Sequence, residues 1–325
     1  MATASIKPVA VCNLVHIGTL VTAGRVALYC GAACLPRNRL LLVDCGAGKV
    51  TLYDRSNGVV LAVSDKLHST PYDICVLDKK GTQVAVTFWN GNVQIFSVQS
   101  KSQSAAIRTL KTLTTKLDQC YGIRAIPSRE QLVVSGLHHG MLCWCVLSYS
   151  GKEFGSIHEI CKYRDLGTYV VISNDQSSVY ISCFAGEGSP DTAVYGYDLE
   201  NARCKFKYCH SDLTWPRGLC VDSRCYIYVC SSMKPACVHQ LTEDGQLVQI
   251  IRDVIPEEPI AMCLDETRQE LFMTCYGRIE VHRFNLKWNE GAKGGLKSIV
   301  QRLVRNFHFP GFSGKQTQQH EKMSQ

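Results

Sequence analysis

Two adjacent histidines are the residues of this sequence best suited to metal or acid–base chemistry. His138 and His139 lie in a short segment between two apolar runs, and imidazoles serve both as metal ligands and as proton carriers near neutral pH. Neighbouring loop residues seldom reach one ion without a third ligand, and the sequence identifies none. We therefore expect a solvated loop here and no metal.

A second candidate is a set of short polar side chains in turns that follow apolar runs: Asp78, Asn174, Asp222 and Asp265. Around a central channel such groups could hold the metal ion of a hydrolase or lyase. They are equally well explained as turn formers. The sequence has no Gly-x-Ser-x-Gly elbow, no phosphate-binding Gly loop and no Cys/His nucleophile motif. We expect no catalytic residue, no cofactor and no enzymatic activity.

Large aromatic and cationic side chains form the third candidate. The predicted binding residues are Trp89, His138, His139, Trp215, Arg217, Lys234, Tyr276 and Arg278. Aromatic and Arg side chains are the usual anchors of protein interfaces. Aromatics that stack on bases, together with cations that meet phosphates, are typical of single-stranded RNA binding. Trp215 could instead pack structurally beside the proline that follows it.

The elements that must position these residues are repeats of four short strands. In residues 215–251, apolar stretches alternate with turn residues. The second stretch of each copy ends at Asp44, Thr87, Ser135, Cys183, Cys230 and Cys275, at intervals of 43 to 48 residues. A period in the forties with four strands per unit is typical of a β-propeller blade. We predict an all-β fold, a six-bladed β-propeller over residues 8–286, whose equivalent loops share one face.

The sixth copy lacks its fourth strand. Its third stretch ends at Leu286, while Pro8 to Gly24 is an uncharged, β-branched run of 17 residues. A membrane span needs about 20 apolar residues. We expect this N-terminal run to supply the missing strand and close the ring, because closure removes exposed sheet edges.

Residues 287–325 form a separate basic tail. It carries seven Lys or Arg and two Glu, so the tail accounts for +5 of the net charge of +7. Residues 295–309 have apolar residues at helical spacing. We predict an amphipathic helix that docks on a membrane surface or in a partner's groove, or else on its own propeller. The Ser- and Gln-rich end is expected to be disordered.

Eighteen cysteines occur without any Cys-x-x-Cys pair, and the chain has no Asn-x-Ser/Thr sequon. Free cysteines behave as small buried hydrophobes, and unpaired thiols persist in reducing compartments. The expected location is the cytoplasm.

The segments 35–58, 70–88 and 215–232 resemble NHL-type repeats, especially those of the C-terminal propellers of invertebrate tripartite-motif (TRIM) proteins. That resemblance implies a six-bladed ring and a role in substrate recognition within a ubiquitin pathway. The zinc pattern and heptads of the TRIM proteins are missing, so their ligase activity is not carried over.

Together these observations lead to three hypotheses for function. The main one is a non-catalytic, monomeric scaffold that binds a protein partner through its loop face. The alternative is a propeller that binds single-stranded RNA, which the nearly neutral body disfavours. The third is a metal-dependent hydrolase or lyase.

Overall fold

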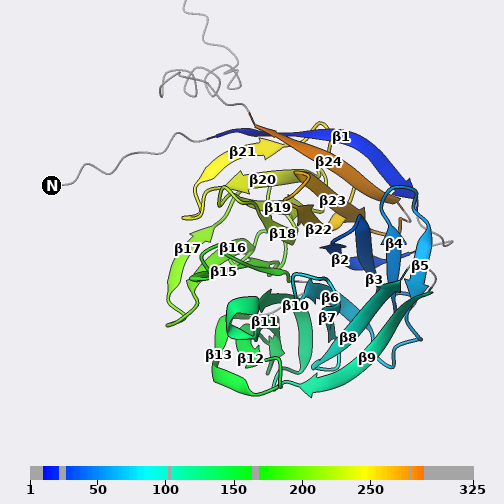
Figure 1. Cartoon of the computed structure of the whole chain (residues 1–325). Helices are drawn as coiled ribbons and strands as arrows, with labels where there is room; N and C mark the ends of the chain where they lie inside the picture. Colours follow the sequence, from blue (N-terminus) through cyan, green and yellow to red (C-terminus); the bar gives the residue numbers. More distant parts are fainter. Residues whose placement is uncertain (1–9, 22–26, 102–103, 163–167, 279, 289–325) are drawn as a thin grey trace, which may run out of the picture. The chain divides into compact units, whose positions relative to one another are not determined.

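The computed structural model describes residues 10–21, 27–101, 104–162, 168–278 and 280–288. They contain six antiparallel sheets of four strands each, and Figure 1 shows these sheets arranged as blades around a centre. The predicted six-bladed β-propeller is therefore confirmed. The chain divides into one unit, Met1–Trp288, which contains the propeller, and a second, Asn289–Gln325. The helix predicted at 295–309 lies outside the described residues and is not supported, and the described part contains no α-helix.

The first three blades follow the chain in order, each from its inner to its outer strand. Blade one comprises β2 (Tyr29–Leu35), β3 (Arg39–Asp44), β4 (Lys49–Asp54) and β5 (Val60–Val63). Blade two comprises β6 (Pro71–Val76), β7 (Gln83–Phe88), β8 (Asn92–Lys101) and β9 (Ser104–Thr114). Blade three comprises β10 (Gln119–Ile126), β11 (Gln131–His138), β12 (Met141–Ser148) and β13 (Glu153–Lys162), with the 3-10 turn η1 (Pro127–Arg129) after β10.

Blades four and five repeat this order. Blade four comprises β14 (Val170–Ile172), β15 (Ser178–Cys183), β16 (Ala193–Asp198) and β17 (Cys204–Tyr208). Blade five comprises β18 (Pro216–Val221), β19 (Ile227–Ser231), β20 (Cys237–Leu241) and β21 (Leu247–Ile251).

Blade six is assembled from both ends of the propeller. It comprises β22 (Pro259–Asp265), β23 (Glu270–Cys275), β24 (Glu280–Trp288) and, as its outer strand, β1 (Cys12–Val21). In Figure 1 the blue β1 lies along the orange β24. The pairing runs from Cys12 opposite Trp288 to Val21 opposite Glu280. This confirms the predicted closure of the ring by the N-terminal strand.

Hydroxyl side chains at the ends of second strands join the blades. The pairing of β6 with β7 shifts register between Pro71 and Ile74, which leaves the N–H of Asp73 without a strand partner, and Thr87 Oγ1 accepts it at 3.0 Å. Ser135 accepts the N–H of Gly122 in the same way at 3.1 Å. Thr87 and Ser135 therefore each satisfy a buried donor that the bulge leaves open.

Glycine lets the inner strands approach closely. A Cβ on Gly122 would lie 2.6 Å from the backbone nitrogen of Val170, and one on Gly218 would lie 2.7 Å from that of Met262. Only a residue without a side chain fits at these contacts. The Pro-x-Gly pattern at the start of blade five thus reflects the packing of that blade on blade six.

Candidate functional site

A pocket of about 570 Å³ lies on the loop face, between blades five and six. Its lining residues are Trp215, Arg217, Ser232, Met233, Lys234, Glu258, Ile260 and Tyr276. They come from the first strands of the two blades, from the loops between second and third strands, and from the crossing between the blades. The volume is within the usual range for small-molecule sites, about 300–1,000 Å³. We call this site the loop-face pocket.

Trp215 forms one apolar wall of the loop-face pocket. Its ring stacks on Phe184 with the centroids 4.8 Å apart, and the guanidinium of Arg217 lies 4.7 Å from its ring centroid. The indole Nε1–H is buried without a hydrogen-bond partner. The stacking on Phe184 and the unpaired donor are features that the sequence did not reveal.

Arg217 is a half-buried cation without an acidic partner. Its Nη1 donates to Tyr72 Oη at 3.4 Å, and its Nε is buried without any partner. Among the described residues, no carboxylate lies within the 4.0 Å of an ion pair with Arg217. Because a guanidinium is always charged, this positive charge faces the pocket uncompensated.

Buried tyrosines from blades two, three and four pack together next to Arg217 of the loop-face pocket. Tyr72 contacts Tyr121 and Tyr169, with ring centroids 5.2 and 5.6 Å apart. Tyr169 Oη donates to the carbonyl of Cys30 at 2.6 Å, across the ring from blade four to blade one. Burial raises the pKa of Tyr72 and of Tyr169, so these phenols are neutral. The cluster adjoins the loop-face pocket through the hydrogen bond between Tyr72 and Arg217.

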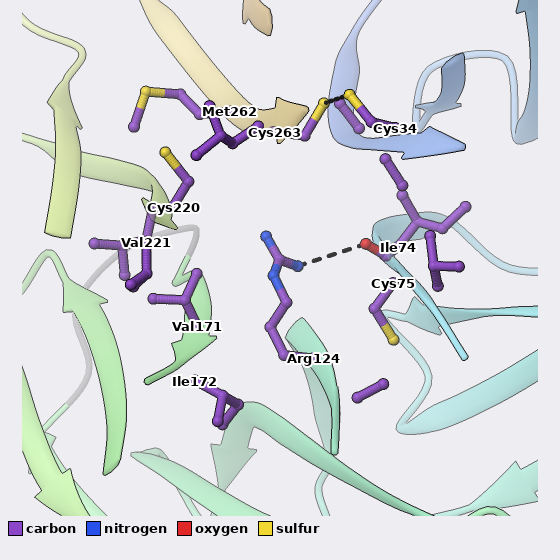
Figure 2. Close-up of a pocket in the computed structure, with 16 residues that line it drawn as sticks. Cys34, Ile74, Cys75, Arg124, Val171, Ile172, Cys220, Val221, Met262 and Cys263 are labelled. Atoms are coloured by element: carbon purple, nitrogen blue, oxygen red, sulfur yellow. Dashed lines mark hydrogen bonds between the residues drawn. The ribbon is translucent and has the colours of Figure 1, made fainter. Parts of the chain in front are cut away.

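The channel itself is a cavity of about 300 Å³, and Figure 2 shows Arg124 pointing into it among aliphatic side chains and thiols. Nη1 of Arg124 donates to Asp73 Oδ2 at 2.8 Å and to the carbonyl of Ile123 at 2.6 Å. The Asp73 carboxylate therefore compensates this guanidinium, in contrast to Arg217.

The channel thiols are poor nucleophiles as they stand. Burial raises the pKa of Cys75 to about 12 and the pKa of Cys220 well above its usual value. For Cys263, a hydrogen bond with Cys34, whose sulfur lies 3.4 Å away, and burial both raise the pKa. Because the thiolate is the reactive form, these groups line the channel as apolar wall.

The polar turn residues do not assemble a metal site in the channel. Asp78 accepts Thr82 Oγ1 at 2.6 Å, Asp222 accepts Tyr228 Oη at 2.9 Å, and Asp265 pairs with Arg55. Asn174 donates to the carbonyl of Asp222 at 2.7 Å. Each has a structural role, as their interpretation as turn formers predicted, and we derive no metal chemistry from them.

The predicted binding residues fall into three places. Trp215, Arg217, Lys234 and Tyr276 line the loop-face pocket. Arg278 lies beside it, and its Nη2 and Lys234 Nζ approach Glu257 at 3.9 and 3.0 Å.

The other three lie in blades two and three. Trp89 is half-buried, packs against the core and does not line the loop-face pocket. His138 and His139 lie in blade three, at the turn between β11 and β12.

Four lining residues were missed: Ser232, Met233, Glu258 and Ile260. Two of them could have been identified from the crossing that enters blade six. Its residues Glu257-Glu258-Pro259-Ile260 occupy the same place in their repeat as Trp215-Pro216-Arg217 in blade five. No helix in the described part is long and apolar enough to cross a bilayer. The protein, RNA and membrane partners expected from the sequence stay predictions.

No protein-family model matches the chain, and no curated protein matches its sequence. Solved structures do share its fold. One is described as a gluconolactonase from Xanthomonas campestris, with a TM-score of 0.57 and 16% identity, covering 83% of this chain and 89% of that one. Another is described as a luciferin-regenerating enzyme, with a TM-score of 0.59 and 14% identity, covering 82% and 96%.

These neighbours correct two expectations. They are enzymes and not TRIM proteins, so the predicted non-catalytic scaffold, with its ubiquitin-pathway role, is wrong, and so is the expectation of no enzymatic activity. The physical reason is that a propeller places varied loops around one rigid face, and the chemistry depends on those loops and not on the repeats. At such low identity the likeness shows the fold alone: the chain is a six-bladed β-propeller.

Proposed function

We propose that this propeller is a hydrolase that cleaves a small ester or lactone in the loop-face pocket. The observation that carries the proposal is the uncompensated guanidinium of Arg217 in the wall of that pocket. The reaction class is supported by the description of one structural neighbour as a gluconolactonase.

The charge of the pocket fits the product of such a reaction. A partly buried cation without an acidic partner is costly, and a ligand that brings a negative charge lowers this cost. Hydrolysis of an ester or lactone creates an oxyanion in the intermediate and a carboxylate in the product. Arg217 Nε and Trp215 Nε1 are both unpaired donors, and preorganised donors of this kind stabilise developing negative charge.

The remaining lining residues suggest the type of substrate. Trp215, Met233, Ile260 and Tyr276 offer aromatic and aliphatic surface. The substrate class is therefore a small carbonyl compound with an apolar or aromatic body.

Glu258 is the one carboxylate among the residues that line the pocket, and it is exposed. In the proposed step it takes a proton from water while the hydroxide adds to the carbonyl carbon. The oxyanion is held by Arg217. The carbon–oxygen bond then breaks and the proton passes from Glu258 to the leaving alkoxide. The carboxylic acid that remains releases its own proton to solvent water, and the resulting carboxylate stays beside the guanidinium.

The test measures initial rates on a panel of aliphatic and aromatic esters and lactones in a pH-stat. We expect turnover of at least one class, with Arg217→Met lowering kcat about 100- to 1,000-fold and Glu258→Gln lowering it about 100-fold or more. The matched controls are Arg129→Met and Glu200→Gln, exposed residues of blades three and four. Absence of hydrolysis across the panel, or full activity of Arg217→Met, overturns the proposed reaction.

Binding of a product analogue tests the anion site of the loop-face pocket independently of the hydrolysis reaction. Benzoate should bind the wild-type protein in calorimetry and fail to bind Arg217→Met. If benzoate binds in this way but no ester or lactone is cleaved, the anion site stands and the hydrolase assignment falls.

We also keep two narrower identifications as proposals. The first is that the repeats are of the NHL type, which is supported by the resemblance of their sequence motifs alone. Location in the cytoplasm is supported by the eighteen cysteines, none of which forms a disulfide, and the thiol titration described below tests it.

A further inference from the structure

We propose that Asp118, His138 and His139 form a binding site for a divalent transition-metal ion of the zinc type on blade three. Each offers one ligand atom, and the three atoms lie within 4.8 Å of one another. They line neither the loop-face pocket nor the channel cavity, so this proposal is independent of the proposed hydrolase activity.

The backbone fixes the three residues next to each other. Asp118 precedes β10, and its N–H donates to the carbonyl of Leu137 at the end of β11 at 2.7 Å. His139 has a positive φ of 50°, and its N–H donates to Asp118 Oδ2 at 2.7 Å. The pairing of β10 with β11 therefore brings the carboxylate to the turn that carries both histidines, although twenty residues separate them in sequence.

The hydrogen bond of His138 prepares its ring as a ligand. Nδ1 lies 3.0 Å from the carbonyl oxygen of Lys116. A carbonyl oxygen only accepts, so Nδ1 carries the proton and, in the neutral ring, Nε2 keeps a free lone pair. Metal-binding histidines regularly donate their second N–H to a backbone carbonyl, which orients the ring. This contact is a second observation, separate from the clustering, that points to a bound ion.

The ring centroids of His138 and His139 are 4.0 Å apart, and Asp118 and His139 are exposed. Ligand atoms on a tetrahedral zinc ion are separated by about 3.3 Å, since the bonds are about 2.0 Å long. Rotation of the exposed Asp118 and His139 side chains is what closes the group around an ion in this proposal.

The ligand types select the ion. Two imidazoles and one carboxylate suit Zn²⁺, Co²⁺, Ni²⁺ or Cu²⁺, whereas Mg²⁺ and Ca²⁺ prefer sites built from oxygen. Three protein ligands leave at least one coordination position for water or an exogenous ligand. The expected occupant is therefore one zinc-type ion with an open position on the protein surface.

The test titrates untagged, metal-free full-length protein with Zn²⁺ in a calorimeter and with Co²⁺ by visible absorption. Because Cys204 and Cys209 are exposed thiols that also bind these ions, the background protein carries Cys204→Ser and Cys209→Ser. We expect one equivalent of ion and a cobalt spectrum without thiolate charge-transfer bands. Each of His138→Ala, His139→Ala and Asp118→Asn should weaken binding at least tenfold.

The matched control is His68→Ala, an exposed histidine outside this group, which should bind the ion as the background protein does. Circular dichroism confirms that each variant is folded. Absence of stoichiometric binding overturns the site, and so does unchanged affinity in the triple variant. Equal weakening in His68→Ala would show only nonspecific coordination by surface histidines and would overturn it as well.

Discussion

Tyr169 of blade four donates its phenolic hydrogen to the carbonyl of Cys30 in blade one, over 2.6 Å, and so connects opposite sides of the ring. Both residues are almost fully buried. The bond gives the propeller a cross-brace at the loop-face end of its channel, in addition to the contacts between neighbouring blades.

Loss of this brace should destabilise the whole ring. Tyr169→Phe leaves the Cys30 carbonyl buried without its partner, which costs about 1–3 kcal/mol. Urea unfolding measures the change. Tyr276→Phe is the control, because Tyr276 is 56% exposed and should change stability by less than about 0.5 kcal/mol. Equal stability of Tyr169→Phe and the wild type would show that the brace is energetically neutral.

An ion pair between Arg55 and Asp265 joins blade one to blade six. Arg55 Nη2 and Asp265 Oδ2 are 2.6 Å apart, with side chains only 2% and 12% exposed. Removing one partner of such a buried pair costs about 3–5 kcal/mol. Asp265→Asn should therefore lose stability of this order at pH 7, measured by urea unfolding. Asp253→Asn, at an exposed aspartate, serves as the control.

The same pair predicts a pH dependence. Burial raises the pKa of Asp265, but hydrogen bonds from Thr267 and Arg55 outweigh it and hold the pKa below its usual value. Above the unfolded-state pKa of about 3.9, the depressed pKa of Asp265 contributes its full stabilisation. This contribution is lost as the pH falls through the folded-state pKa of Asp265. The difference between wild type and Asp265→Asn should shrink as the pH is lowered below about 4. A difference that stays constant would contradict this linkage.

His239 predicts a second dependence, at higher pH. It is completely buried, and Tyr208 Oη lies 2.8 Å from its Nδ1. Burial, with a smaller contribution from nearby His210, lowers its pKa to about 4. The unfolded chain binds the proton first as pH falls below about 6.5, so stability decreases between pH 6.5 and 4, by on the order of 3 kcal/mol.

The check is the slope of stability against pH in urea unfolding. His239→Gln should flatten part of that slope, because the neutral amide has no proton to bind. Burial also lowers the pKa of His158 and His282, so the flattening is partial. An unaltered slope in His239→Gln would contradict the assignment.

Deletion of residues 1–24 should open the ring. It removes β1 with its buried Cys12 and Leu14 and exposes an edge of β24 to pairing with other molecules. We expect aggregation or a large fall in Tm, measured by light scattering and thermal unfolding. A truncated protein that stays monomeric with the Tm of the full chain would contradict the structural importance of the closure.

Thiol reactivity should follow burial. All eighteen cysteines are free, and Cys204 and Cys209 are the exposed ones. In the folded protein a thiol reagent should modify these two rapidly and buried ones such as Cys230 slowly, because burial raises the pKa of Cys230. After denaturation without reductant, all eighteen should react. Recovery of only a few thiols would contradict both the free cysteines and a reducing compartment.

The sequence was a good guide to architecture because a propeller repeats one local pattern. Hydroxyl residues in the second strands, such as Thr87 and Ser135, occupy equivalent places because the bulge in the first strand leaves the same backbone donor open. Closure could be predicted because the sixth copy lacked a strand and an uncharged run stood at the other end of the chain. Both inferences depended on spacing, which a sequence displays directly.

The candidate sites were predictable only in part, because they depend on side-chain direction and on distant pairs. Trp215 and Arg217 were identified, but the missing acidic partner of Arg217 appears only in three dimensions. Asp118 could not be assigned to His138 and His139 without the register of β10 against β11. Trp89 was predicted as a binding residue, and its half-buried ring packs on the core, which loop position alone could not show.

The pairing of β1 with β24 also has a consequence for synthesis. The first residue of β24, Glu280, follows the last residue of β1, Val21, by 259 residues. At about 5–20 residues per second, β1 leaves the ribosome roughly 13 to 50 seconds before its partner exists. Throughout that interval the hydrogen-bonding edge of β1 has no native partner strand. The nascent chain therefore has an extended period of exposure in which a chaperone, or another copy of the chain, competes with completion of the ring.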